Sequence, residues 1–198
     1  MPSVKYPEQA YWIERGLESI VPAGNDNPEG FDPTEIVEHY ALGSILEIGC
    51  GFGRIARGLD PKRYLGLDIN PKAIELAKVA HPKHTFEVIS GDKYPSAETI
   101  LYYTVMLHMG PDALAHEIEK ISAGRYKRVI VCEIMDEKWR REGNPPVFNR
   151  SPESYIKGFE VYGWNLLSRE DRPYNHYVGQ RWDDSRSTEI TCLVFDRD

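Results

Sequence analysis

The sequence predicts a single α/β domain built on a doubly wound, largely parallel sheet. From residue 44 onward, short apolar runs such as SILEIG, YLGLDI and RVIVCEI alternate with amphipathic stretches such as PKAIELAKVA. Apolar runs of this length, separated by helices, are typical of βαβ units whose strands are covered on both faces. The chain has 198 residues, of which 41% are hydrophobic and 28% charged, so a substantial core is available.

The elements can be placed in order along the chain. Residues 6–20 carry Tyr11, Trp12 and Leu17 at helical spacing, and a loop rich in Gly, Pro, Asn and Asp follows. A second helix is expected over residues 33–40, with Asp32 as its N-cap. Further helices are expected over residues 54–59, 71–80, 111–122 and 154–163. Strands are expected within residues 44–49, 64–69, 86–90, 99–105, 128–134, 163–170 and 188–198.

Composition excludes several classes of function. The 24 basic and 31 acidic residues give a net charge of −7, which argues against a protein that grips phosphate backbones. Cys50, Cys132 and Cys192 are too widely spaced for a disulfide framework or a metal site, so we expect reduced thiols, a cytoplasmic location and no metal. We expect neither a secretion signal nor a membrane span, because no apolar run approaches the required length.

A glycine-rich loop follows the first expected strand. Gly49, Gly51 and Gly53 stand where that strand turns into the next segment, so a ligand can approach the backbone closely. A dinucleotide fold is disfavoured because Arg54 occupies the position of its third glycine. A triphosphate loop is disfavoured because no Gly-Lys-Ser/Thr follows and Glu47 would repel phosphates. The expected ligand is therefore one that tolerates or prefers nearby negative charge.

Three motifs in succession resemble those of the class I S-adenosylmethionine-dependent methyltransferases. They are E-I-G-C-G-F-G at residues 47–53, L-G-L-D-I-N-P at residues 65–71 and S-G-D at residues 90–92. The resemblance runs from about residue 44 to residue 133. S-adenosylmethionine is a cation without phosphate, so it meets the expectation that the ligand of this loop tolerates or prefers nearby negative charge. It implies a Rossmann-like, seven-stranded, mostly parallel sheet with an antiparallel last strand and an N-terminal helical cap. It also implies S-adenosyl-L-methionine as cofactor and S-adenosyl-L-homocysteine as product.

The resemblance assigns roles to individual residues. The glycines would lie under the methionyl part with Glu47 close to it, and Asp68 would take the ribose hydroxyls. Ile69 would flank the adenine, and Asp92 would receive its amino group, unless Asp92 only begins a loop. The full expected cofactor-binding set comprises Glu47, Gly49, Cys50, Gly51, Gly53, Asp68, Ile69, Asp92, Lys93 and Tyr103.

The segment TVMLHM resembles the stretch that follows the fourth strand in this family, which makes His108 the candidate general base. The alternative is a packing or capping histidine. Tyr11 and Trp12 are expected to form a lid over the acceptor. Tyr174, His176 and Arg181 are expected to form an opposite wall, unless they belong to an ordinary exposed hairpin. Glu133 either points into the cleft or caps its strand.

These expectations define one methyltransferase domain over residues 1–198. Residues 1–43 would form a helical cap, residues 44–135 the cofactor-binding core, and residues 136–198 the acceptor-side helix and the C-terminal strands. The expected reaction is methyl transfer to an O or N atom of a small-molecule acceptor, by a monomer or homodimer. The alternatives are an RNA or protein methyltransferase and an inactive cofactor-binding protein.

Overall fold

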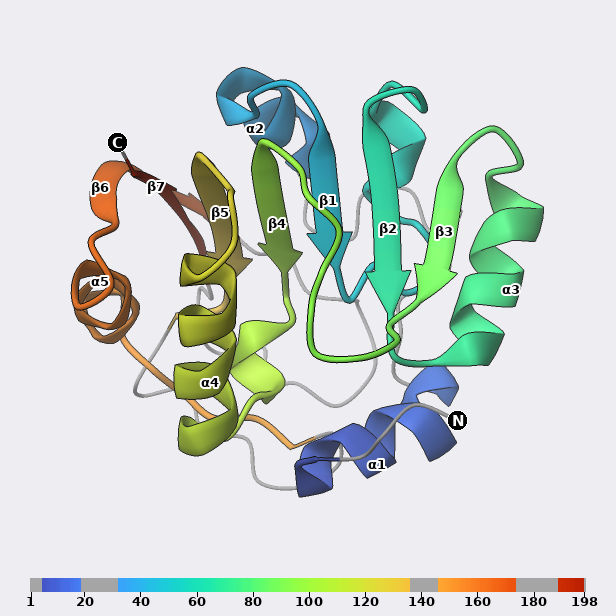
Figure 1. The fold of residues 1–198 in the computed structure, drawn as a ribbon, viewed down its shortest axis with the longest axis horizontal. Helices are drawn as coiled ribbons and strands as arrows, with labels where there is room; N and C mark the ends of the chain where they lie inside the picture. The colour runs from blue at the N-terminus through green and yellow to red at the C-terminus, as the bar shows by residue number, and fades with distance from the viewer. Residues whose placement is uncertain (1–4, 19–31, 136–145, 174–188, 198) are drawn as a thin grey trace.

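A seven-stranded sheet runs through the molecule in the order β3-β2-β1-β4-β5-β7-β6 (Figure 1). The structure is a computed structural model that describes residues 5–18, 32–135, 146–173 and 189–197. The strands are β1 (Ile45–Ile48), β2 (Tyr64–Asp68), β3 (Thr85–Val88), β4 (Thr99–Tyr103), β5 (Arg128–Glu133), β6 (Asn165–Pro173) and β7 (Glu189–Asp196). Neighbours among β1 to β5 are parallel, and β7 is antiparallel to both β5 and β6. The predicted mostly parallel sheet with an antiparallel last strand is confirmed.

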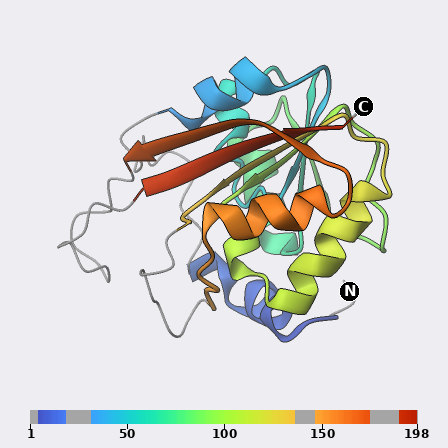
Figure 2. The same cartoon turned by 90° about the vertical axis from the view of Figure 1, so that its left-hand side faces the viewer.

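Helices cover both faces of this sheet. On one face α2 (Pro33–Tyr40) and α3 (Pro71–Ala80) pack against alternate strand residues, among them Ile45 and Leu101. On the other face α4 (Pro111–Ser122) and α5 (Pro152–Glu160) pack against the intervening residues, and Figure 2 shows α2 on the opposite side of the sheet from α4 and α5. Burial on both faces explains why the strands are apolar at successive positions rather than at alternate ones.

The expected helix over residues 54–59 is not formed as a full helix, and this prediction was wrong. Its place is taken by a short 3-10 turn at Ala56–Gly58. A Cβ atom at Gly58 would lie 2.5 Å from Oγ1 of Thr34 on α2, so the turn packs closely against that helix. Gly58 and the nearby Pro61 both disfavour helix continuation, which leaves too few residues for a stable helix.

The N-terminal helix α1 (Pro7–Glu14) runs across the carboxyl ends of the strands, below the arrowheads in Figure 1. It is shorter than the expected helix over residues 6–20, because a separate 3-10 turn follows at Gly16–Glu18. The sheet order reverses between β1 and β4, and in open α/β sheets ligands bind at the carboxyl ends beside such a reversal. The fold therefore places any ligand site between these strand ends and α1.

Candidate cofactor and catalytic site

A cavity of about 270 Å³ lies at the carboxyl ends of β1, β2 and β4. Most of the predicted site residues that the structure describes line it, namely Trp12, Glu47, Gly49, Cys50, Gly51, Asp68, Ile69, Asp92, Tyr103 and His108. The predicted residues Gly53, Lys93 and Tyr11 are described but do not line it. Tyr174, His176 and Arg181 lie outside the described residues. The three sequence motifs therefore converge on one space.

The glycine loop approaches this cavity with its backbone. Gly49 and Gly51 have φ angles of 74° and 53°, a region that favours glycine. A Cβ atom at Gly49 would lie 2.5 Å from Cγ2 of Val105. The loop is held to β2 because the N–H groups of Gly49 and Cys50 both donate to the carbonyl oxygen of Leu67, at 2.7 and 3.0 Å. The loop therefore presents main chain, with little side chain, to a ligand.

Gly53 serves packing instead. Its φ angle is 80°, and a Cβ atom there would lie 2.8 Å from His81 and 2.9 Å from Phe86. Cys50 is 4% exposed, and burial raises the pKa of its thiol well above the usual range. A thiol in that state is a poor nucleophile, so Cys50 is a small packed residue in the cavity wall.

Asp68 closes β2 and is 7% exposed. Its Oδ2 accepts the N–H of Gly51 at 2.9 Å, and its Oδ1 accepts the N–H of Asn70 at 2.8 Å. Burial raises the pKa of this carboxyl, and the backbone hydrogen bonds oppose that shift. Each carboxylate oxygen can accept more than one hydrogen bond, so both oxygens retain capacity for a ligand hydroxyl.

Glu47, on β1, is 2% exposed and accepts a hydrogen bond from the hydroxyl of Tyr64. Burial raises its pKa to about 7, against the lowering effects of Tyr64 and Arg54. A buried carboxylate facing a cavity is costly to ionise unless a cation comes close. We call Glu47, the loop Gly49–Gly51 and Asp68 the strand-end wall.

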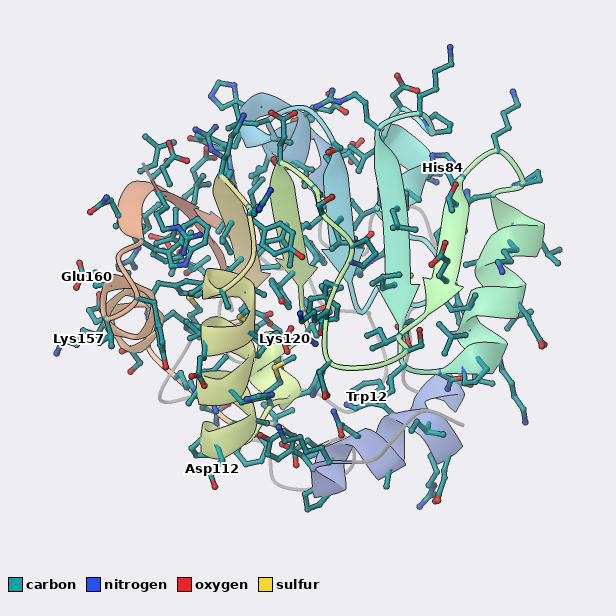
Figure 3. All side chains as sticks on the ribbon, viewed as in Figure 1. Trp12, His84, Asp112, Lys120, Lys157 and Glu160 are labelled. Carbon is teal, nitrogen blue, oxygen red and sulfur yellow. The ribbon has the colours of Figure 1, made fainter. Side chains whose placement is uncertain are left out.

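The opposite boundary, which we call the helical wall, consists of α1 and the α4 residues His116, Glu117 and Lys120. Oε1 of Glu117 accepts hydrogen bonds from the hydroxyls of Tyr94 and Tyr102, at 2.8 and 2.6 Å. Nζ of Lys120 lies 3.8 Å from Oε2 of Glu117 and 3.3 Å from the centroid of the Tyr94 ring. In Figure 3, Lys120 lies beside the loop that joins β3 to β4.

Helix α1 is attached to the rest of the protein by polar contacts, and none of its residues is buried. Oε1 of Glu8 accepts the N–H of Gly110 at 2.7 Å, and the carbonyl oxygen of Trp12 accepts Nδ2 of Asn70 at 2.8 Å. Just before the helix, Nζ of Lys5 lies 3.0 Å from Nε2 of His116. These contacts hold α1 to both sides of the cavity, and Figure 3 shows Trp12 between α1 and the strand ends.

His108 ends a 3-10 turn, Met106–His108, that follows β4. The centroid of its ring lies 4.6 Å from that of the Trp12 ring, in an edge-to-face arrangement. Its Nδ1 lies 2.7 Å from the carbonyl oxygen of Pro146. Because a carbonyl can only accept, Nδ1 carries the proton, and Nε2 of the neutral ring holds the lone pair that a general base needs.

Sequence reasoning missed a set of cavity-lining polar side chains. They are Lys5, Glu8, Gln9, Arg54, His116, Glu117 and Lys120. His116, Glu117 and Lys120 share one polar side of α4, but polar residues at helical spacing are equally typical of a solvated surface. Arg54 was recognised only as a departure from the dinucleotide motif, whereas its guanidinium lies 4.7 Å from the centroid of the Tyr103 ring.

The described residues hold neither a metal-binding cluster nor a membrane-spanning helix. In those segments no group of three or more His, Cys, Asp or Glu side chains is arranged to hold a metal ion. None of the helices in the described parts of the chain has the length and apolar character needed to cross a bilayer.

Known proteins share this fold, and part of the chain matches a known domain. Residues 46–121 match the family model of the methyltransferase domain. Magnesium protoporphyrin IX methyltransferase from Synechocystis PCC 6803, with bound S-adenosylhomocysteine, superposes with a TM-score of 0.69 at 13% identity, over 96% of this chain and 98% of that one. The search of the curated proteins found no match.

Two other solved structures are similarly close. A putative methyltransferase, in complex with the Haloferax volcanii Trm112 methyltransferase activator, has a TM-score of 0.68 at 14% identity, over 98% of this chain and 100% of that one. A structure that concerns the conversion of a disulfide bond into a thioacetal group during echinomycin biosynthesis has a TM-score of 0.67 at 19% identity. The match covers 96% of this chain and 90% of that one.

The fold is Rossmann-like, and residues 46–121 within it match the methyltransferase domain. More particularly, the matched segment and the fold resemble those of S-adenosylmethionine-dependent methyltransferases, among them one solved with bound S-adenosylhomocysteine. The residues present fit S-adenosylmethionine as cofactor. Glu47 offers a buried carboxylate to a cation, Asp68 offers hydrogen-bond acceptors to hydroxyls, and Gly49–Gly51 leaves room for close approach.

Proposed function

We propose that this methyltransferase transfers the methyl group to an oxygen or nitrogen atom of a small-molecule acceptor, with His108 as general base. One observation carries the proposal: His108 lines the same cavity as Glu47 and Asp68. Acceptors that attack through O–H or N–H must lose a proton, and an imidazole with a pKa near neutrality is suited to take it.

The strand-end wall would hold the cofactor. Glu47 would face its positive charge, Asp68 would accept hydrogen bonds from the ribose hydroxyls, and Ile69 and Asp92 would contact the adenine. When bound, S-adenosylmethionine supplies a methyl group on a sulfonium, already activated for displacement. The protein therefore has to align the acceptor, exclude water and remove a proton.

His108 would remove the proton at Nε2. The acceptor oxygen or nitrogen would receive the methyl group that the cofactor supplies, and it would give up its own proton to the protein. The acceptor's proton passes to Nε2, and the resulting imidazolium keeps its Nδ1–H on the carbonyl oxygen of Pro146. That hydrogen bond stabilises the charged ring, since a carbonyl dipole favours a cationic donor.

Two features favour a small acceptor. Helix α1 lies across the strand ends, and its Trp12 ring contacts His108, so the base faces a covered cavity. The net charge of −7 disfavours a nucleic-acid substrate.

The test uses His108→Gln, with His39→Gln, an exposed histidine on α2, as the matched control. Labelled S-adenosylmethionine is incubated with each variant and a metabolite extract, and product is measured below and above a size cut-off. We expect turnover to fall on the order of 100-fold in His108→Gln alone, with cofactor affinity by calorimetry within about threefold. Unchanged turnover would refute the base, and label only in RNA or protein would refute the acceptor class.

A further inference from the structure

A buried carboxylate accepts hydrogen bonds from the loop that carries His108. Glu133, the last residue of β5, is 0% exposed. Its Oε1 accepts the N–H groups of Val105 and Met106 at 2.9 and 2.7 Å, and its Oε2 accepts that of Leu107 at 3.4 Å. These N–H groups open the 3-10 turn Met106–His108 and have no partner within it. Glu133 therefore caps the turn at whose end His108 stands.

A guanidinium donates hydrogen bonds to the other end of the same turn. Nη2 of Arg150 donates to the carbonyl oxygen of Met109 at 2.6 Å, and Nη1 donates to that of Met106 at 3.3 Å. The carboxylate thus takes the free donors at the start of the turn, and the guanidinium serves acceptors toward its end. This is the charge arrangement that a helical turn favours.

The segment that supplies Arg150 also supplies the partner of His108. The carbonyl oxygen of Pro146 accepts Nδ1 of His108, and Phe148 donates its N–H to the carbonyl oxygen of Leu107 at 2.8 Å. The placement of the turn and the proton position on the imidazole therefore depend on one set of contacts.

The backbone entering the turn is strained. Among the described residues, Thr104 is the one non-glycine with a positive φ angle, 54°. Its N–H donates at 2.9 Å to the carbonyl oxygen of Cys132, the residue before Glu133. Strained backbone of this kind persists only where its surroundings impose it, and it is concentrated at functional sites. The end of β5 imposes it here.

Burying a carboxylate at this position carries a desolvation cost in free energy. Burial raises the pKa of Glu133 to about 7, although three backbone N–H groups and Arg150 act in the opposite direction. Apolar side chains would pack the same position without that desolvation cost. The carboxylate therefore has a specific effect, which is to accept three neighbouring N–H groups at once.

We propose that Glu133 is a positioning residue for methyl transfer: together with Arg150 it fixes the loop Thr104–Gly110, so that His108 keeps Nδ1–H on Pro146 and presents Nε2 to the acceptor. The inference depends on the proposed role of His108. Glutamine cannot accept all three of these hydrogen bonds, because its amide has one acceptor atom and its NH₂ group would face an N–H donor.

The decisive readout is the tautomer of His108, since a merely structural role would not change it. Histidine is labelled with ¹⁵N, His108 is assigned by its loss in His108→Gln, and long-range correlations show which ring nitrogen carries the proton. In Glu133→Gln we expect the Nδ1–H form to lose its dominance. We also expect kcat to fall about tenfold with little change in KM or in cofactor affinity.

Thr99→Val is the matched control. Thr99 is fully buried at the amino end of β4, and its hydroxyl accepts the N–H of Leu42 at 2.7 Å. Losing it should lower the melting temperature without changing the His108 tautomer. If Glu133→Gln likewise lowers stability and leaves the tautomer unchanged, the positioning role is overturned.

A second variant decides the question if Glu133→Gln does not fold. Arg150→Lys keeps the charge but loses the fork that reaches Met106 and Met109. We expect the same tautomer change to a smaller extent, and an unchanged tautomer would overturn the proposal. The tautomer is measured without an acceptor, so the outcome is distinct from failure of the proposed base, which appears as unchanged turnover in His108→Gln.

Discussion

The strand-end wall and the helical wall enclose one cavity but are built differently. Glu47 and Asp68 stand on neighbouring parallel strands, are 2% and 7% exposed, and are fixed by a tyrosine hydroxyl and by backbone N–H groups. Helix α1 buries none of its residues and is attached by contacts such as Glu8 to Gly110. A side chain on a buried strand is held rigidly, whereas an element with few buried apolar contacts opens at low cost. The first wall is suited to recognition, and the second to letting ligands enter and leave.

The largest effect should come from the strand-end wall. Asp68→Ala removes a proposed ribose acceptor and also releases the N–H groups of Gly51 and Asn70. We expect S-adenosylmethionine affinity, measured by calorimetry, to fall about 100-fold, or ~3 kcal/mol, as for a charged hydrogen-bond partner. Asp92→Asn is the comparison within the same cavity. Asp92 is exposed, so its loss should cost less than about tenfold. Equal losses would contradict the ranking.

Glu47 should make cofactor binding depend on pH. Its pKa is raised to about 7, so in the free protein it is mostly protonated at pH 6. A cationic ligand favours the ionised form, so binding below pH 7 must release a proton. We expect affinity to fall as the pH falls, by about tenfold per pH unit below 7. Calorimetry from pH 5.5 to 8 in Glu47→Gln should give a flatter profile, and an equally steep one would show that another group is responsible.

The smallest effect is expected from the helical wall. Glu8→Gln replaces a carboxylate acceptor of the Gly110 N–H with a neutral one. We expect cofactor affinity to fall about threefold, through a cost of ~0.6 kcal/mol, with faster hydrogen exchange confined to α1. Glu14→Gln, at an exposed position on the same helix, should change neither quantity. A loss as large as that of Asp68→Ala would mean that α1 is no less rigid than the strands.

The same contrast explains what could be predicted from sequence. Glu47, Asp68 and the glycine loop lie in continuous motifs next to apolar strands, so both their type and their spacing are visible. Helices α2 and α4 begin and end where expected, because proline opens each and Asp32 caps the first. Local physics determines these features.

Other features depend on tertiary contacts that no local pattern contains. The segment at residues 54–59 forms only a 3-10 turn because Gly58 packs against Thr34 of a different helix. Lys120 and Glu117 line the cavity only because Tyr94 and α4 meet there. Glu133 could have pointed into the cleft or capped its strand. The partners of its carboxylate belong to another loop, and only the fold brings them together.

The position of β7 has a consequence for how this chain reaches its final form. Residues 189–196 insert between β5 and β6, and within the described parts of the chain β6 pairs with β7 alone. A nascent chain that has emerged only as far as residue 188 would hold β6 without a hydrogen-bonding neighbour and β5 with one side open. The sheet is therefore completed only after residues 189–196 have been made, and a truncation that removes β7 would also leave β6 without the strand it pairs with.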